Sequence, residues 1–169
     1  RTHDVNYELN SHGYRTKEWN DIDWQDAVVI FGASDLLGVG LSEKDTISSV
    51  LSSLLNCPVI NLGVGASSMQ FSFYNSLILH KHYPTPRAVV NIWTNCYRTT
   101  FFGDDSPKNI GAWDSKSKLF QEWSASPGNP SNYAASLAYA SSIIWKDIKY
   151  YTASFFDETS DLLNCEFFP

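Results

Sequence analysis

The sequence of 169 residues contains little cysteine and no excess of positive charge, and these deficits argue against several classes of protein. Cys57, Cys96 and Cys165 are odd in number and widely spaced, unlike the dense pairs of a disulfide scaffold or the short spacings of a zinc site. The net charge is −6 at pH 7, and acidic and basic residues are interspersed. We therefore expect no nucleic-acid partner and no basic helix that binds an anionic membrane.

Long apolar runs are also missing. No stretch approaches the roughly 20 apolar residues of a membrane-spanning helix, and the sequence begins at Arg1 rather than at methionine. We expect a soluble chain with no membrane partner, no transmembrane segment and no signal peptide. Composition leaves the compartment and the oligomeric state open.

Histidine is scarce, with four residues in all and none after His82. His80 and His82 are too close in sequence for the i, i+4 spacing of a helical metal pair, and no third ligand is evident. The glycines between residues 32 and 40 have neither the spacing of a dinucleotide-binding turn nor that of a phosphate-binding loop. We therefore expect neither a metal nor a cofactor.

Apolar residues make up 43% of the chain and aromatic residues 15%, enough for the core of one domain. We expect a single domain over residues 1–169. Residues 1–26, polar and aromatic without periodicity, are predicted to wrap the domain as an extended arm. Residues 99–131, rich in glycine, proline, serine and aspartate, are predicted to form a long insertion loop with about one helical turn.

Strand and helix patterns alternate four times along the chain. Short apolar runs predict buried strands at residues 27–31 and 59–62, a third strand at 88–92 and an aromatic strand at about 149–155. Helical spacing predicts intervening helices at about residues 47–55, 68–82 and 132–147. This order requires parallel strand pairs and predicts an α/β fold with a three-layer αβα arrangement.

Apolar side chains at helical spacing identify the faces that the first two helices should bury. We expect the first helix to bury Ile47, Val50, Leu51, Leu54 and Leu55, and the second to bury Phe71, Tyr74, Leu77 and Ile78.

Three polar or glycine-rich turns follow the first three predicted strands. They read Gly32-Ala33-Ser34-Asp35, Asn61-Leu62-Gly63-Val64-Gly65-Ala66 and Trp93-Thr94-Asn95-Cys96. Because parallel strands end at the same edge of a sheet, these turns should meet there. A serine hydroxyl, freed main-chain amides and a side-chain amide at that edge would supply a nucleophile and an oxyanion hole for acyl transfer.

These motifs resemble those of the SGNH (GDSL-type) hydrolases, which carry a Gly-Asp-Ser block, a glycine block and a Gly-x-Asn-Asp block in this order. Two flanking segments add to the likeness: Asn10-Ser11-His12-Gly13-Tyr14-Arg15 is similar to an Asn-x-x-Gly-Phe-Arg lead-in, and Gly38-Val39-Gly40-Leu41 to the loop after the serine. The resemblance implies a flavodoxin-like parallel sheet and esterase or deacetylase chemistry.

The resemblance also implies roles for individual residues. Ser34 matches the nucleophile and Asn95 matches the asparagine that donates to the oxyanion. The glycine of the second block falls on Ala66 when counted from Asn61, and Gly65 lies beside it. We therefore expect the Ser34 amide, the Gly65 or Ala66 amide and the Asn95 side chain to be the oxyanion donors.

Other positions depart from the family pattern. Ala33 stands in place of the first-block aspartate, Trp93 in place of the third-block glycine and Cys96 in place of the third-block aspartate. The closing Asp-x-x-His block is missing from residues 157–169. An active enzyme would need that histidine from beyond Pro169, because a serine without a base is a poor nucleophile at neutral pH.

Two functions follow from this pattern. The first is an esterase or carbohydrate O-deacetylase-like domain with an acylated carbohydrate or small ester as substrate. The alternative is a catalytically inactive domain used for glycan binding or as a structural or virion component. Trp113, Trp123 and Trp145 would supply an aromatic sugar-binding surface in that case, or else pack beneath the insertion. A nucleotide-binding flavodoxin-like module is a third, more distant alternative.

Overall fold

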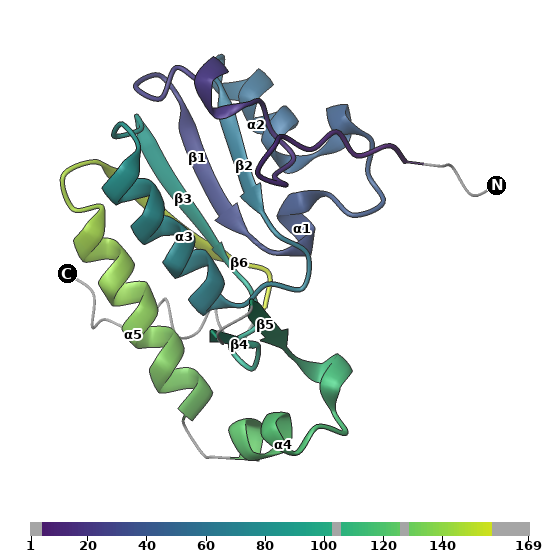
Figure 1. The fold of residues 1–169 in the computed structure, drawn as a ribbon. Coiled ribbons are helices and arrows are strands. Elements are labelled where there is room, and N and C mark those ends of the chain that lie inside the picture. The colour runs from purple at the N-terminus through teal and green to yellow at the C-terminus, as the bar shows by residue number, and fades with distance from the viewer. Residues whose placement is uncertain (1–4, 103–105, 126–128, 157–169) are drawn as a thin grey trace.

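In the computed structural model, four parallel strands form a sheet in the order β2-β1-β3-β6 (Figure 1). The structure describes residues 5–102, 106–125 and 129–156. The strands are β1 (Val28–Gly32), β2 (Val59–Gly63), β3 (Ala88–Trp93) and β6 (Lys149–Ser154). The four predicted strands are thus confirmed, with β1 at the centre between β2 and β3.

Helices cover both faces of the sheet, which confirms the predicted three-layer α/β class. On one face lie α1 (Ser34–Leu37) and α2 (Ile47–Leu55), and on the other lie α3 (Met69–His82) and α5 (Asn129–Ile144) (Figure 1). The side chain of Thr46 caps α2 by accepting from the amide of Ser49, and Ser68 caps α3 in the same way.

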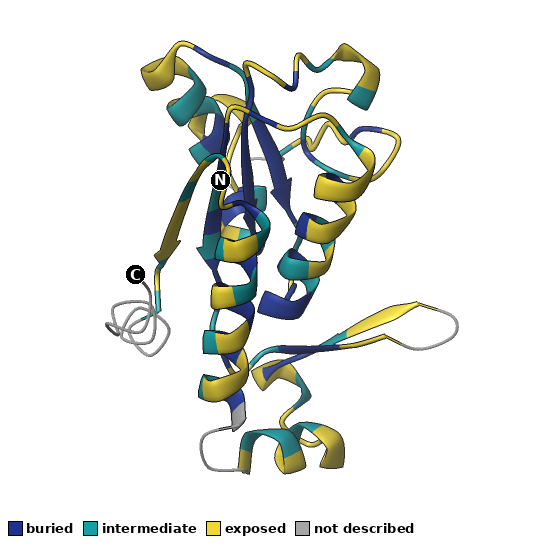
Figure 2. Cartoon of the chain, turned by 90° about the vertical axis from the view of Figure 1, so that its left-hand side faces the viewer, coloured by how far each residue is buried: buried dark blue, intermediate teal, exposed yellow. Residues whose placement is uncertain are grey.

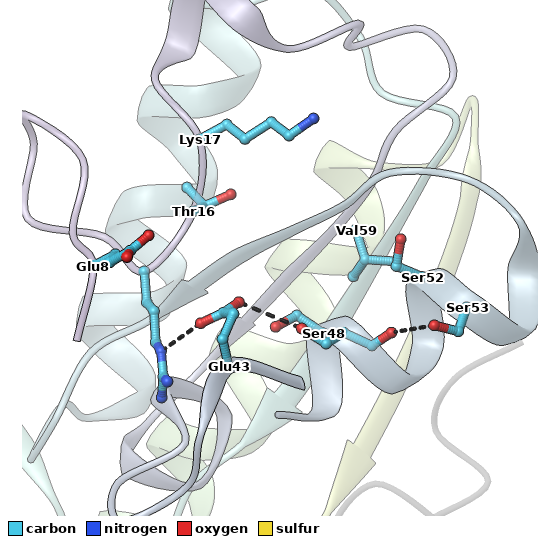
Figure 3. Close-up of a pocket in the computed structure, with 10 residues that line it drawn as sticks. Glu8, Thr16, Lys17, Glu43, Ser48, Ser52, Ser53 and Val59 are labelled. Carbon is cyan, nitrogen blue, oxygen red and sulfur yellow. Dashed lines mark hydrogen bonds and ion pairs between the residues drawn. The ribbon is translucent and has the colours of Figure 1, made fainter. Parts of the chain in front are cut away.

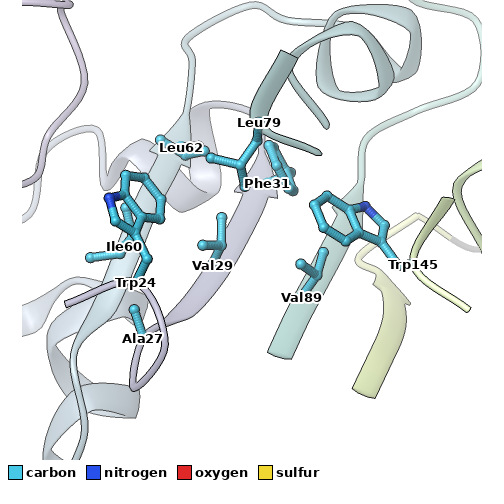
Figure 4. Packing of buried hydrophobic residues seen from close by; sticks show 9 residues of the cluster. All are labelled: Trp24, Ala27, Val29, Phe31, Ile60, Leu62, Leu79, Val89 and Trp145. Atoms are coloured by element: carbon cyan, nitrogen blue, oxygen red, sulfur yellow. The ribbon is translucent and has the colours of Figure 1, made fainter. Parts of the chain in front are cut away.

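The core is built on the central strand, all five residues of which are buried. Side chains alternate along a strand, so Val29 and Phe31 face α3 and α5, where they pack with Leu79 and Trp145 (Figure 4). Their neighbours Val28 and Ile30 belong to a second cluster on the opposite face. The continuous apolar run of β1 is therefore explained by burial on both faces.

The predicted buried faces of the helices are wrong for most of their residues, although Ile47, Leu51 and Phe71 are half-buried and Ile47 packs against the core. In α2, Leu54 is 75% exposed, and in α3 Tyr74, Leu77 and Ile78 are all exposed. Figure 2 shows exposed and buried segments alternating along the helices. Small polar side chains face the sheet instead. These are Ser48 of α2 and Ser72 and Ser76 of α3.

Buried polar groups explain this arrangement. The Asn61 side chain on β2 donates to Ser48 Oγ at 3.2 Å, and the indole of Trp145, directly after α5, donates to Ser76 Oγ at 2.6 Å. Both donors would be costly to bury without acceptors. The serines supply those acceptors, and their small size lets the helices approach closely.

The arm and the insertion are more structured than predicted. Residues 5–26 include the short helix η1 (Trp19–Asp21), and a further short helix, η2 (Glu43–Asp45), precedes α2. The insertion holds an antiparallel pair, β4 (Thr99–Phe102) and β5 (Pro107–Ile110), then η3 (Ala112–Asp114) and α4 (Lys118–Ala125). These elements lie beyond the carboxyl end of β3 (Figure 1). The expectation of a single helical turn is therefore wrong.

Candidate functional site

The turns after β1, β2 and β3 lie at one edge of the sheet, because the three strands are adjacent and parallel. Ser34 is half-buried and is the first residue of α1, directly after β1. The carbonyl of Gly32 accepts from the amide of Val64 at 3.1 Å and from Ser67 Oγ at 3.2 Å. These bonds tie the serine turn to the glycine-rich turn after β2.

Helix α1 lies directly against the backbone of β2. A Cβ atom on Gly63 would lie 2.6 Å from the amide nitrogen of Leu37, closer than real Cβ contacts allow. The Asn61 side chain also donates to the carbonyl of Leu36 at 2.8 Å and accepts from the Gly63 amide at 2.9 Å. Asn61 therefore has a structural role: it fixes the helix that begins with Ser34.

The arm holds the loop after the serine through Arg15, which is 2% exposed. Its guanidinium donates to three carbonyl oxygens, those of Leu37 at 3.1 Å, Gly38 at 3.0 Å and Leu41 at 3.0 Å. Its Nε donates to Glu43 at 2.7 Å. The segment around Arg15 and the loop after Ser34 are thus in direct contact.

The Asn10 side chain shapes the turn that carries Arg15. Its oxygen accepts from the amides of His12 and Tyr14, both at 3.0 Å, and its amide donates to Lys17. Gly13 within this turn has φ +82°, a left-handed conformation that favours glycine. The motif therefore directs Arg15 toward the loop after Ser34.

Asn95 follows β3 and is half-buried. Its Oδ1 accepts from the amide of Tyr97 at 2.9 Å, which fixes the orientation of the side-chain amide. Among the described residues, nothing accepts a hydrogen bond from Asn95 Nδ2 or from the backbone amides of Ser34, Gly65 and Ala66. The groups expected as oxyanion donors thus lie on three neighbouring turns with their N–H groups unused.

The backbone of the second turn distinguishes Gly65 from Ala66. Ala66 is exposed and has φ +58°, the left-handed region that L-residues with a Cβ disfavour. Gly65 does not have a positive φ, and a Cβ there would meet only Leu37 Cδ2 at 3.6 Å. Alanine therefore occupies the position that calls for glycine, while glycine occupies one where alanine would fit.

No residue in the described ranges hydrogen-bonds to the Ser34 hydroxyl. His80 and His82 lie at the end of α3, which runs from the carboxyl end of β2 back to the start of β3, so both lie at the opposite edge of the sheet. His12 stacks on Trp19, whose ring also packs against Trp24 just before β1. His3 and residues 157–169 lie outside the described residues.

The substituted motif positions are all buried. Ala33 is 3% exposed, Trp93 1% and Cys96 3%. Trp93 and Cys96 pack in a cluster with Met69 of α3 and with apolar residues of α5. These side chains extend the core toward the edge of the sheet.

A cavity of about 420 Å³ lies between the arm and α2 (Figure 3). Its lining includes Glu8, Lys17, Glu43 and the serines of α2. Since it also reaches Val59, the first residue of β2, it lies away from the carboxyl edge that carries Ser34. None of the residues predicted for the site lines it.

Arg98 was not identified from the sequence, because no motif marks the segment after Asn95. Burial lowers the pKa of Arg98, and the charge of Asp35, next to Ser34, opposes this effect. Arg98 lies in the turn after β3, where its amide donates to the carbonyl of Asn95 at 3.1 Å, and its charge interacts with that of Asp35. It belongs to the same edge as the predicted residues.

The three tryptophans considered for a sugar-binding surface do not form one. Trp145 is 2% exposed and belongs to the main core cluster. Trp123 of α4 donates to the carbonyl of Tyr97 at 3.2 Å, and Trp113 of η3 is half exposed. Only Trp113 and Trp123 lie in the insertion near Asn95.

Within the described ranges, no helix has the length and apolar character to cross a bilayer. The same residues contain no cluster of three histidine, cysteine, aspartate or glutamate side chains suited to a metal ion.

Comparisons with known proteins add evidence on the fold. No protein-family model and no curated protein matches the sequence. Among solved structures, a mutant of the esterase AlinE4 aligns over 86% of this chain and 70% of its own, with 14% identity and a TM-score of 0.50. The crystal structure of AlinE4, described as an SGNH-hydrolase family esterase, aligns over 43% of this chain with 19% identity and a TM-score of 0.38, and the alignment spans 42% of that chain. The chain therefore has an α/β fold that is distantly similar to that of an SGNH-hydrolase esterase.

Proposed function

We propose that the chain is an SGNH-type ester-hydrolase domain that acts on acylated carbohydrates or small esters, with Ser34 as the nucleophile. One observation supports the proposal: Ser34 begins α1 at the carboxyl end of the central strand, at the edge of the sheet where the two neighbouring turns carry amide donors without acceptors among the described residues. The distant likeness of the fold to that of AlinE4 supports it.

In the proposed reaction, Ser34 Oγ attacks the carbonyl carbon of the ester. The bond to the alcohol oxygen then breaks and leaves an acyl-serine, which water hydrolyses to release the acid and regenerate the hydroxyl. The amides of Ser34 and of Gly65 or Ala66, with Asn95 Nδ2, would stabilise the negative charge on the carbonyl oxygen.

The Ser34 proton must pass to a base and from there to the departing alcohol. No described residue is in position to accept it, so efficient turnover requires a base from outside the described ranges. In a serine protease, loss of the catalytic histidine lowers turnover roughly a millionfold, while roughly a thousandfold acceleration remains from binding and the oxyanion hole. The proposal therefore predicts a serine that can be acylated, at a rate set by access to a base.

The test is covalent labelling. The protein is incubated with a fluorophosphonate, and separately with 4-nitrophenyl acetate, and the modified peptide is identified by mass spectrometry. Modification of Ser34 that is lost in Ser34→Ala is the expected result. Ser42→Ala is the matched control, because Ser42 lies in the exposed loop after α1 and should leave labelling intact. Equal labelling of the wild type and Ser34→Ala would contradict the proposal.

A second candidate is an inactive domain that binds glycans or has a structural role. It is favoured by the buried residues Ala33, Trp93 and Cys96 at motif positions. In that case acetylated xylan oligosaccharides would bind without release of acetate, and Ser34→Ala would bind them as the wild type does. Release of acetate that depends on Ser34 would exclude this candidate.

A further inference from the structure

A cavity of about 360 Å³ adjoins Asn95 on the insertion side of the sheet edge. It is lined by residues from the turn after β3, from η3 and α4, and from the segment after β6. These residues are Asn95, Tyr97, Arg98, Ala112, Trp113, Phe120 and Phe156. Its walls are thus largely aromatic, and Arg98 is its one cationic lining residue.

Aromatic rings surround the Arg98 guanidinium. Its central carbon lies 5.4 Å from the ring centroid of Trp113 and 5.8 Å from that of Phe156. Such contacts engage the faces of a guanidinium and leave the N–H groups at its edge to bind an acceptor in the plane. Arg98 is therefore held in a fixed orientation in the lining of the cavity.

The Nη1 atom of Arg98 is buried and has no hydrogen-bond partner among the described residues. Asp35 acts on Arg98 through its charge, but within the described ranges no carboxylate lies within ion-pair distance of the guanidinium. Because Nη1 itself is shielded from solvent, an acceptor that enters the cavity would pair with the remaining N–H groups of the guanidinium, for which no described residue supplies an acceptor oxygen.

We propose that this cavity is a subsite for a carboxylate carried on an apolar stem. The carboxylate pairs with the edge of the Arg98 guanidinium, and the stem packs against Trp113, Phe120 and Phe156. A planar carboxylate matches the fork of an arginine, and the aromatic walls suit an apolar stem better than a fully hydrated ion.

The role of this subsite in catalysis rests on the proposed function. Asn95 is both part of the cavity lining and an expected oxyanion donor, so a group in the cavity lies beside the reacting carbonyl. The substrates would then be esters whose acyl part ends in a carboxylate, such as hemiesters of dicarboxylic acids. Neutral acetyl esters would leave Arg98 unpaired.

Binding without turnover tests the subsite directly. The Ser34→Ala variant, labelled with nitrogen-15, is titrated with 3-phenylpropionate and, as the matched neutral probe, with 3-phenylpropionamide. We expect the acid to bind at least about tenfold more tightly, the equivalent of one charge-assisted hydrogen bond. Amide signals of residues 95–98 and 112–113 should shift with the acid.

Variants at two cavity positions and at one control position separate the charge of Arg98 from its packing. Arg98→Gln should abolish the preference for the acid, whereas Arg87→Gln, at an exposed arginine on the other edge of the sheet, should retain it. Ala112→Glu adds a carboxylate to the exposed lining and should also abolish binding of the acid, with Arg98 left in place. Equal affinity for acid and amide, or an unchanged preference in both cavity variants, would overturn the proposal.

Fluorophosphonate labelling separates this inference from the proposed function. If Ser34 is not labelled but the acid binds through Arg98, the esterase proposal fails and the carboxylate site remains. If Ser34 is labelled and the acid shows no preference, the subsite fails and the nucleophile remains. In an active preparation, 4-nitrophenyl hemisuccinate should be cleaved faster than 4-nitrophenyl acetate, and Arg98→Gln should remove that difference.

Discussion

The guanidinium of Arg15 donates to the carbonyl oxygen of Leu37, the last residue of the helix that begins with Ser34. The two residues are 22 positions apart in sequence, and the contact joins the N-terminal arm to the turn behind the proposed nucleophile. Further bonds from the same side chain reach Gly38 and Leu41. The arm is therefore part of the support of the site.

Replacing Arg15 should destabilise the fold and loosen this loop. Arg15→Lys keeps the charge but loses the planar fork that reaches several carbonyls, so we expect a loss of about 3 kcal/mol in the free energy of unfolding. Urea denaturation measures this loss. The control is Arg87→Lys at an exposed pair with Asp26, where we expect a change below about 0.5 kcal/mol. Similar stability losses in the two variants would contradict the supporting role of Arg15.

The close packing of α1 on β2 predicts opposite outcomes at two neighbouring glycines. Gly63→Ala would force a Cβ into the backbone of Leu36 and Leu37 and should cost about 2–3 kcal/mol. Gly65→Ala makes one ordinary contact at 3.6 Å and should leave stability unchanged or raise it by up to about 1 kcal/mol. Thermal unfolding of the two variants compares them. A tolerated alanine at Gly63 would show that α1 does not rest on the strand.

The left-handed backbone of Ala66 predicts a stabilising substitution. Ala66→Gly relieves the conflict between the Cβ and the carbonyl oxygen, offset in part by the greater freedom of glycine in the unfolded chain, for a net gain of about 0.5 kcal/mol. Ala33→Gly is the opposing control, because Ala33 is buried at a negative φ and should lose about 1 kcal/mol. Differential scanning calorimetry measures whether each variant is more or less stable than the wild type. Destabilisation by Ala66→Gly would rule out strain at this position.

Tyr150 on β6 predicts a loss of stability in alkaline solution. Burial raises the pKa of Tyr150 to about 12, and side-chain hydrogen bonds, including one of 3.2 Å from Asn91, lower it only in part. Between pH 10 and 12 the unfolded chain releases the phenol proton while the folded chain retains it. The free energy of unfolding should therefore fall with rising pH, by about 2 kcal/mol from this residue.

The measurement is urea denaturation at several pH values from 9 to 12, chosen to bracket this range. Tyr150→Phe lacks the titrating group, so its stability should decline less steeply than that of the wild type. Parallel profiles for the two proteins would mean that the phenol titrates alike in the folded and unfolded states.

The sheet could be predicted because each strand, and the turn that follows it, is identified by residues that are adjacent in the sequence. Continuous apolar runs such as Val28 to Phe31 identify a strand buried on both faces, and the turns that follow the strands place Ser34 and Asn95 at one edge. The parallel order follows from the alternation of strands and helices. These features depend on residues close together in the chain.

The helix faces could not be predicted, because they depend on pairs far apart in sequence. Ser76 is buried since it accepts from Trp145, which is 69 residues away, and Ser48 is buried beside Asn61. Hydrophobic periodicity assigned the inner face to leucines and tyrosines and missed both pairs. The same limit applies to Arg98, whose significance comes from Trp113 and Phe156 around it.

The burial of Ala33 bears on how this sequence could change over evolutionary time. An aspartate at this position would have to enter a site that is 3% exposed, where an unpaired carboxylate is strongly disfavoured. Acquiring the aspartate of the Gly-Asp-Ser block would thus require compensating substitutions around it as well. Selection acting on one residue at a time would therefore tend to preserve the alanine.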